Sequence, residues 1–152
     1  MTNVEHEAEE LIASFGVAFP IDPQVICNRI TSDSFKIEYR EEPFQAKHIC
    51  GISIGDQQAA QIVVNSNILN PKRRLFTSAH EIGHVILHIQ RGKKSNFQCT
   101  DADIRETENQ EKSLEIEANK FASALLMPKK LIQEKVNKND LTWNLILDNQ
   151  VF

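Results

Sequence analysis

The residues with the clearest chemical potential are His80, Glu81 and His84, which form the motif His-Glu-x-x-His. Two residues four apart lie on one face of a helix, so both imidazole rings can reach a single metal ion. With about 100° of rotation per residue, Glu81 stands beside this pair, where its carboxylate can take a proton from a water at the ion. The spacing therefore predicts a metal site with His80 and His84 as ligands and Glu81 as the base.

The motif lies within a predicted helix over residues 72–90, which opens at Asn70-Pro71 and ends near Gly92. An apolar stripe runs along the side opposite the histidines: Leu75, Ala79, Ile82, Ile86 and Ile89. This context favours a metal site over the alternative of two ordinary surface histidines. Gly83 costs about 1 kcal/mol of helix stability relative to alanine, so we expect it to admit the close approach of another segment.

A catalytic zinc site needs a third protein ligand. The extended form HExxHxxGxxH is excluded, because Leu87 and Gln90 stand where its glycine and third histidine would be. The remaining candidates are glutamates on a second long predicted helix over residues 111–127, namely Glu111, Glu115 and Glu117. Their spacing alone does not decide among them.

Glu115 borders the apolar side of this second helix, next to the small residues Ala118 and Ala122, which would allow a close approach to the His80 helix. We expect Asn119 to hydrogen-bond a ligand there. Glu117 lies on the opposite border and is expected to form a surface pair with Lys120. His88 continues the histidine row and is expected at the surface or behind a ligand, rather than as a ligand.

The remaining elements are predicted from periodicity and turn residues. Helices are expected over residues 4–15 and after Asp22-Pro23, followed by strands over 35–39, 49–54 and 61–65, the last two antiparallel. Residues 93–110 are expected to form a polar loop, 129–137 a short helix, and 140–152 a helical turn or strand. Helices, then strands, then helices indicate an α+β fold in a single domain over residues 1–152.

Composition excludes several other classes of protein. The chain has 152 residues, of which 41% are hydrophobic and 25% charged, as in ordinary globular domains. A net charge of −4 argues against direct nucleic-acid binding, and no apolar run is long enough to cross a membrane. The acidic N-terminus predicts no secretion signal, and three scattered cysteines suit reduced thiols, so we expect a cytoplasmic protein.

Three stretches carry a resemblance to a known family: PIDPQVICNRI, RRLFTSAHEIGHVILH and EIEANKFASALLMP. Over roughly residues 8–130 the chain resembles the ImmA/IrrE family of zincin-like metallopeptidases. The resemblance implies a gluzincin-type fold with a small antiparallel or mixed sheet, an HExxH helix and a second ligand-bearing helix. It also implies zinc held by His80, His84 and Glu115, with Glu81 as the catalytic base. The implied substrate is a helix-turn-helix repressor of a mobile element or stress response.

Two functions stay open at this point. One is metal-dependent peptide hydrolysis, and the other is a non-catalytic, metal-stabilised regulatory module, such as an antitoxin-like or phage accessory protein. The presence of Glu81 favours hydrolysis, because a structural metal needs ligands but no base. Zinc is expected, although other divalent ions suit two histidines and a carboxylate. The strand over residues 61–65 is a candidate edge for an extended substrate, although ordinary sheet pairing is the favoured role for it. Tyr39, His48 and His88 are candidates for a second oxyanion donor, and a structural role is favoured for each of them.

Overall fold

The computed structural model describes residues 3–15, 21–100 and 112–127. Within these residues, four α-helices, one π-helical segment and four strands follow one another along the chain. Their order is α1 (Asn3–Phe15), α2 (Pro23–Ile30), β1 (Lys36–Glu42), β2 (Ile49–Gly55), β3 (Ala59–Asn65), α3 (Pro71–His84), η1 (Val85–Ile89), β4 (Asn96–Thr100) and α5 (Lys112–Leu126).

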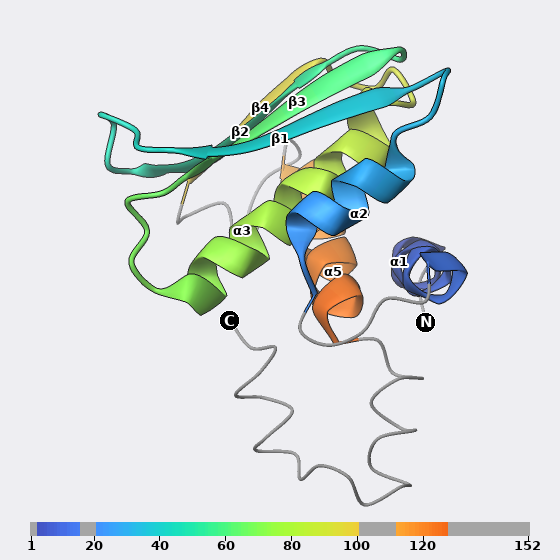
Figure 1. Cartoon of the computed structure of the whole chain (residues 1–152), viewed down its shortest axis with the longest axis horizontal. Coiled ribbons are helices and arrows are strands. Elements are labelled where there is room, and N and C mark those ends of the chain that lie inside the picture. The colour runs from blue at the N-terminus through green and yellow to red at the C-terminus, as the bar shows by residue number, and fades with distance from the viewer. Residues whose placement is uncertain (1–2, 16–20, 101–111, 128–152) are drawn as a thin grey trace, which may run out of the picture.

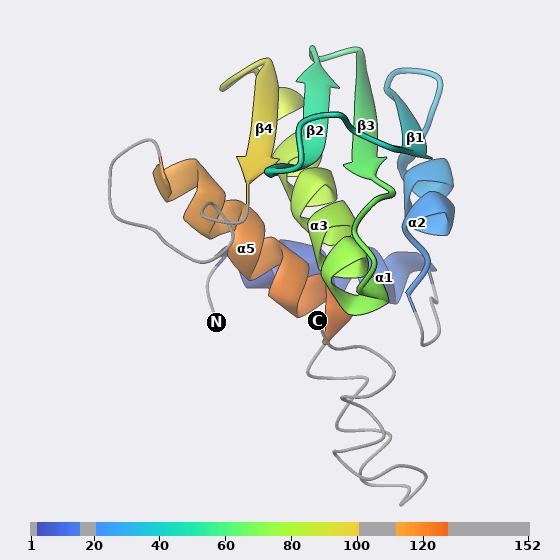
Figure 2. The same cartoon turned by 90° about the vertical axis from the view of Figure 1, so that its left-hand side faces the viewer.

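The strands form a mixed sheet in the order β1-β3-β2-β4. β1 pairs with β3 in parallel, whereas β2 is antiparallel to both β3 and β4. All four α-helices lie on one side of the sheet, with α2 and α3 directly beneath it and α1 and α5 farther away (Figures 1 and 2). The predicted α+β fold with a small mixed sheet is confirmed.

β4 corrects the prediction of a loop over residues 93–110. Its side chains alternate, with Phe97 and Cys99 buried while Asn96 and Gln98 are exposed. The polar residues face away from the helices, and their abundance concealed a strand whose inward face has only two apolar side chains. Residues 101–111 lie outside the described part of the chain.

The helix starts follow the predicted capping chemistry. Asp22 accepts a hydrogen bond from the Gln24 amide at 2.9 Å, and Asn70 accepts one from the Lys72 amide at 2.9 Å. In both helices a proline occupies the first position, where a missing amide hydrogen costs nothing. The Asn70 cap determines where α3 begins, and the start of the helix determines toward which side His80 and His84 point.

The helix predicted over residues 72–90 changes character after His84. Its α-helical part ends there, and Val85–Ile89 form a wider π-helical turn, in which the Gln90 amide donates to the Val85 carbonyl at 2.8 Å. Gly92, with a φ of 74°, then reverses the chain. Such π turns are rare and frequently lie at functional sites.

Several predictions fall outside the described residues, namely the helix over 129–137, the segment 140–152 and candidate ligand Glu111. Cys27, Cys50 and Cys99 are buried, and no disulfide joins them. Of the described helices, none combines the length and the apolar character needed to span a bilayer.

Candidate metal centre

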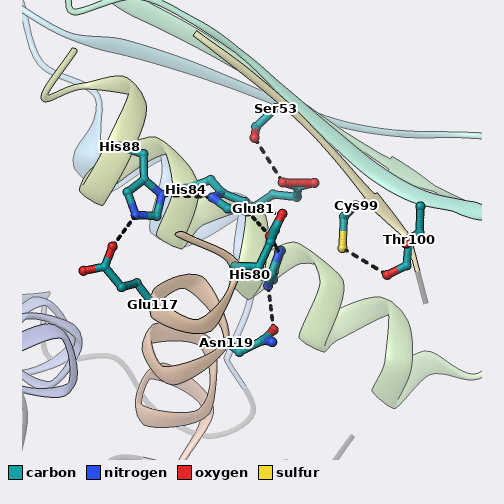
Figure 3. Close-up of polar contacts among 10 residues, drawn as sticks. Ser53, His80, Glu81, His84, His88, Cys99, Thr100, Glu117 and Asn119 are labelled. Carbon is teal, nitrogen blue, oxygen red and sulfur yellow. Dashed lines mark hydrogen bonds and ion pairs between the residues drawn. The ribbon is translucent and has the colours of Figure 1, made fainter. Parts of the chain in front are cut away.

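His80, Glu81 and His84 lie together on α3, each with a fully buried side chain. One potential ligand atom from each lies within 4.8 Å of the others. Figure 3 shows the three side chains beneath the sheet, beside the end of α5. The histidine side of α3 is buried as completely as its apolar stripe because α5 packs across it, so these histidines are not ordinary surface residues.

Glu115, on α5, bridges the two histidines. Its Oε2 lies 3.1 Å from His80 Nε2 and 2.7 Å from His84 Nε2. Of the two candidate third ligands in the described part of the chain, Glu115 and Glu117, Glu115 is therefore the one that the fold brings to both rings. Glu117 instead lies 2.9 Å from His88 Nε2, so the predicted surface pair with Lys120 is wrong. The reason is that this side of α5 faces η1, where the buried ring of His88 binds the Glu117 carboxylate.

Two further contacts explain why α5 can approach α3 so closely. A Cβ at Gly83 would lie 3.1 Å from Phe121 Cδ1, so the two helices meet where α3 has no side chain. This confirms the expected role of Gly83. Asn119 Oδ1 lies 2.8 Å from His80 Nδ1, the contact expected of Asn119. Gly83, Phe121 and Asn119 therefore determine how closely α5 approaches α3, although none of them is directed at the Nε2 atoms of His80 and His84.

The hydrogen bonds indicate which ring nitrogen of His80 is exposed to Glu115. Because the Asn119 carbonyl oxygen can only accept, His80 donates its Nδ1 hydrogen, and in the neutral ring the lone pair is on Nε2. Nε2 of His80 and Nε2 of His84 are both directed at the Glu115 carboxylate, which can only accept. A cation held between them would take the place of the Nε2 hydrogen and meet the lone pair of each ring. Two nitrogens and a carboxylate directed at one point are a donor set typical of catalytic zinc, so the residues present fit a divalent cation.

The site strongly perturbs its ionisable groups. Burial alone would raise the pKa of Glu115, but its hydrogen bonds to His80 and His84 outweigh burial and lower the pKa to about 2. Burial lowers the pKa of His84 to about 4. Burial also acts to lower the pKa of His80, but the Glu115 hydrogen bond and the charges of Glu81 and Glu115 raise it overall. Glu115 is thus an anion, and His84 a neutral ring, near neutral pH.

Glu81 is held from the sheet side. Ser53, a fully buried residue of β2, donates to Glu81 Oε1 at 3.0 Å (Figure 3). A Cβ at Gly51 would lie 2.9 Å from Glu81 Oε2, so the carboxylate lies directly against the β2 backbone. Sequence reasoning missed Ser53. Its signal is a small polar residue at an inward position between the apolar residues Ile52 and Ile54.

The aromatic neighbour of the site was also missed. Phe97 of β4 stacks on the His84 ring with a centroid separation of 3.7 Å and an interplanar angle of 13°. Because the composition of residues 93–110 is typical of a polar loop, no local pattern places Phe97 beside His84. This contact joins β4 to α3 and restrains the plane of the His84 ring.

The strand over residues 61–65 has the ordinary sheet pairing that is favoured for it and is not an edge for a substrate. Residues 61–65 belong to β3, which is paired on both sides, with β1 and with β2. It therefore has no free edge for a peptide. The parallel pairing of β1 with β3 closes it, and such a long-range pairing cannot be inferred from local alternation. In the described part of the chain, β4 pairs only with β2, and its Phe97 touches His84.

The three candidate oxyanion donors occupy different places. The Tyr39 hydroxyl shares a 2.6 Å hydrogen bond with Ser78, and His48 is exposed. His88 is fully buried, with both ring nitrogens engaged by His84 and Glu117. His88 therefore has no free donor to offer a substrate.

Comparison with known proteins gives two findings. The family model described as the IrrE N-terminal-like domain, a peptidase family, matches residues 32–144. "Uncharacterized immunity region protein 2" of Bacillus phage phi105 is 34% identical over 96 residues, which make up 62% of this chain and 56% of that protein. The chain thus spans about half the length of this curated relative. The family match includes all of α3, η1 and α5.

Proposed function

The chain belongs to the peptidase family of the IrrE N-terminal-like domain, and we propose that it is a zinc-dependent metallopeptidase with Glu81 as its catalytic base. The observation that carries this proposal is the convergence of His80 Nε2, His84 Nε2 and the Glu115 carboxylate, with Glu81 one position along the helix. A structural metal site would need only the first three.

In the proposed mechanism, His80, His84 and Glu115 hold the cation. When bound, a divalent cation supplies Lewis acidity, which polarises a carbonyl oxygen and acidifies water. Glu81 removes the proton from the attacking water and later delivers it to the leaving amine. Ser53 orients the Glu81 carboxylate through Oε1, and the β2 backbone at Gly51 prevents the side chain from retreating. Burial of all these groups keeps bulk water from competing for their hydrogen bonds.

The proposed substrate is a regulatory protein, namely a helix-turn-helix repressor of a mobile element or stress response. Support comes from the relative in phage phi105, whose name assigns it to an immunity region. A cytoplasmic location is part of the same proposal, because such a repressor acts on DNA inside the cell. The alternative is a non-catalytic module that binds the repressor and uses the metal only for stability.

The variant Glu81→Gln separates these two functions. The amide keeps the size of the side chain but cannot accept a proton, so the variant should retain one zinc per chain and lose cleavage. The assay is to mix zinc-loaded protein with the helix-turn-helix protein encoded beside its gene and to follow fragments by mass spectrometry. Glu10→Gln, an exposed acid on α1, is the matched control and should cleave normally.

Full cleavage by Glu81→Gln would refute the proposed base. Zinc-loaded wild type that binds the repressor, relieves repression and produces no fragments would favour the non-catalytic module.

A further inference from the structure

A second pair of side chains, His88 and Glu117, lies directly behind His84. His84 Nδ1 is 3.0 Å from His88 Nδ1, and His88 Nε2 is 2.9 Å from Glu117 Oε1 (Figure 3). The His88 side chain is fully buried, whereas that of Glu117 is 38% exposed. These contacts form one continuous line from the metal centre to the surface of α5.

The chemistry of these groups determines which atom donates in each of the two hydrogen bonds. The Glu117 carboxylate can only accept, so His88 donates its Nε2 hydrogen to it. In the neutral His88 ring, Nδ1 is then an acceptor and takes the Nδ1 hydrogen of His84. With a cation between His84 and Glu115 in place of the hydrogen that Glu115 accepts, the lone pair of His84 would lie on Nε2, the nitrogen that faces Glu115.

We propose that His88, held by Glu117, is a positioning residue that fixes the tautomer and rotation of His84 so that His84 Nε2 offers its lone pair to the cation. The inference rests on the proposed metal site and adds two residues to it. Neither residue touches the cation or the substrate.

The surroundings of His84 leave this task to His88. Phe97 stacks on the His84 ring and so restrains its plane, but a 180° flip about the Cβ–Cγ bond returns the ring to the same plane with Cδ2 and Cε1 in the places of Nδ1 and Nε2. A hydrogen bond at Nδ1 prevents the flip. His80 is restrained in the corresponding way by Asn119, so each histidine has one partner at its Nδ1 atom.

The π-helical turn is the backbone feature that carries His88. It begins immediately after His84, and the Lys93 amide donates to the His88 carbonyl at 2.8 Å to close its far end. The turn also presents His88 toward α5, where Glu117 meets it. The π-helical turn thus holds His88 between His84 and Glu117.

The test measures zinc affinity by competition with a chromophoric chelator. His88→Leu fills the buried space but removes both hydrogen bonds, and it should bind zinc about 10–100-fold more weakly, the usual cost of losing such a partner. His88→Gln keeps an acceptor and a donor and should stay within a few-fold of wild type. Ile89→Val, a buried change on the same turn, is the matched control and should bind zinc normally.

Equal losses in His88→Leu and His88→Gln would show that packing, not hydrogen bonding, matters, and would overturn the proposal. So would wild-type affinity in folded His88→Leu. If wild type itself bound no zinc, the metal site would fail as well, so the two failures are distinguishable.

A second measurement applies even if His88→Leu does not fold. Glu117→Ala changes a partly exposed side chain, and ¹⁵N–¹H correlation spectra of the zinc-loaded protein report the His84 tautomer directly. Wild type should show a proton on Nδ1 and the metal on Nε2, and Glu117→Ala should weaken zinc binding. A metal on His84 Nδ1, or Glu117→Ala with unchanged affinity and spectra, would overturn the proposal.

Discussion

Substitution of Gly83 by alanine tests whether the close contact of α3 with α5 holds the metal site together. In an open helix this change would stabilise the protein by about 1 kcal/mol. Here the new Cβ would lie 3.1, 3.2 and 3.3 Å from three side-chain atoms of Phe121. Phe121 is fully buried, so its ring cannot swing into solvent. Overpacking of this kind costs about 1–3 kcal/mol, which offsets or exceeds the helical gain.

The consequence for metal binding should be larger than that for folding. To relieve the contact, α5 must move away by a few tenths of an ångström, and Glu115 moves with it. Metal–ligand distances tolerate only about 0.2 Å. We therefore expect Gly83→Ala to bind zinc at least about tenfold more weakly, equivalent to about 1.4 kcal/mol, while its melting temperature changes little or falls.

The assay combines thermal unfolding of the metal-free chain with zinc competition, in a double-mutant cycle with Phe121→Leu. Because leucine is smaller than phenylalanine, the double variant should bind zinc more tightly than Gly83→Ala alone. The single variant Phe121→Leu measures the effect of losing the phenylalanine ring by itself. If Gly83→Ala raised the melting temperature by the full helical gain and bound zinc like wild type, the reasoning about this interface would be refuted.

Two further perturbations test the base and the buried histidine. Gly51→Ala would place a Cβ 2.9 Å from Glu81 Oε2 and 3.0 Å from Thr77 Cγ2, so it should displace Glu81, keep zinc and slow hydrolysis about 10²-fold; an unchanged rate would contradict the placement of Glu81. In the metal-free chain, burial lowers the pKa of His84 from 6.5 to about 4, so the unfolded chain binds the proton first. The His84 contribution to stability is then complete above pH 6.5 and should fall by up to about 3 kcal/mol between pH 6.5 and 4. Because the pKa of His80 is raised and its contribution has the opposite pH dependence, the His84 contribution is measured as the difference in urea unfolding between wild type and His84→Gln; a difference independent of pH would contradict the burial of a neutral His84.

The parts of the fold that depend on local chemistry could be predicted from the sequence. The starts of α2 and α3 follow from Asp22-Pro23 and Asn70-Pro71, because a cap and a proline act within one turn. The convergence of His80 and His84 follows from helical spacing alone. The role of Gly83 followed too, since a glycine in a helix needs a reason from outside that helix.

Other features depend on how distant segments meet, and the sequence could not supply them. Glu115 and Glu117 border the apolar side of α5 almost equally, and only the angle at which α5 crosses α3 turns Glu115 toward the two histidines. The π turn after His84 uses the same apolar residues that an α-helix would use. β4 was hidden because three of its five residues are polar and face away from the core.

The central claim is that α3 and α5 together hold one cation through His80, His84 and Glu115. Its most direct test is a crystal of the zinc-saturated protein measured on both sides of the zinc absorption edge. We expect one anomalous peak, about 2.0–2.2 Å from Nε2 of each histidine and from a Glu115 oxygen. A zinc-saturated crystal with no peak between these side chains, or with its peak at other residues, would contradict the claim.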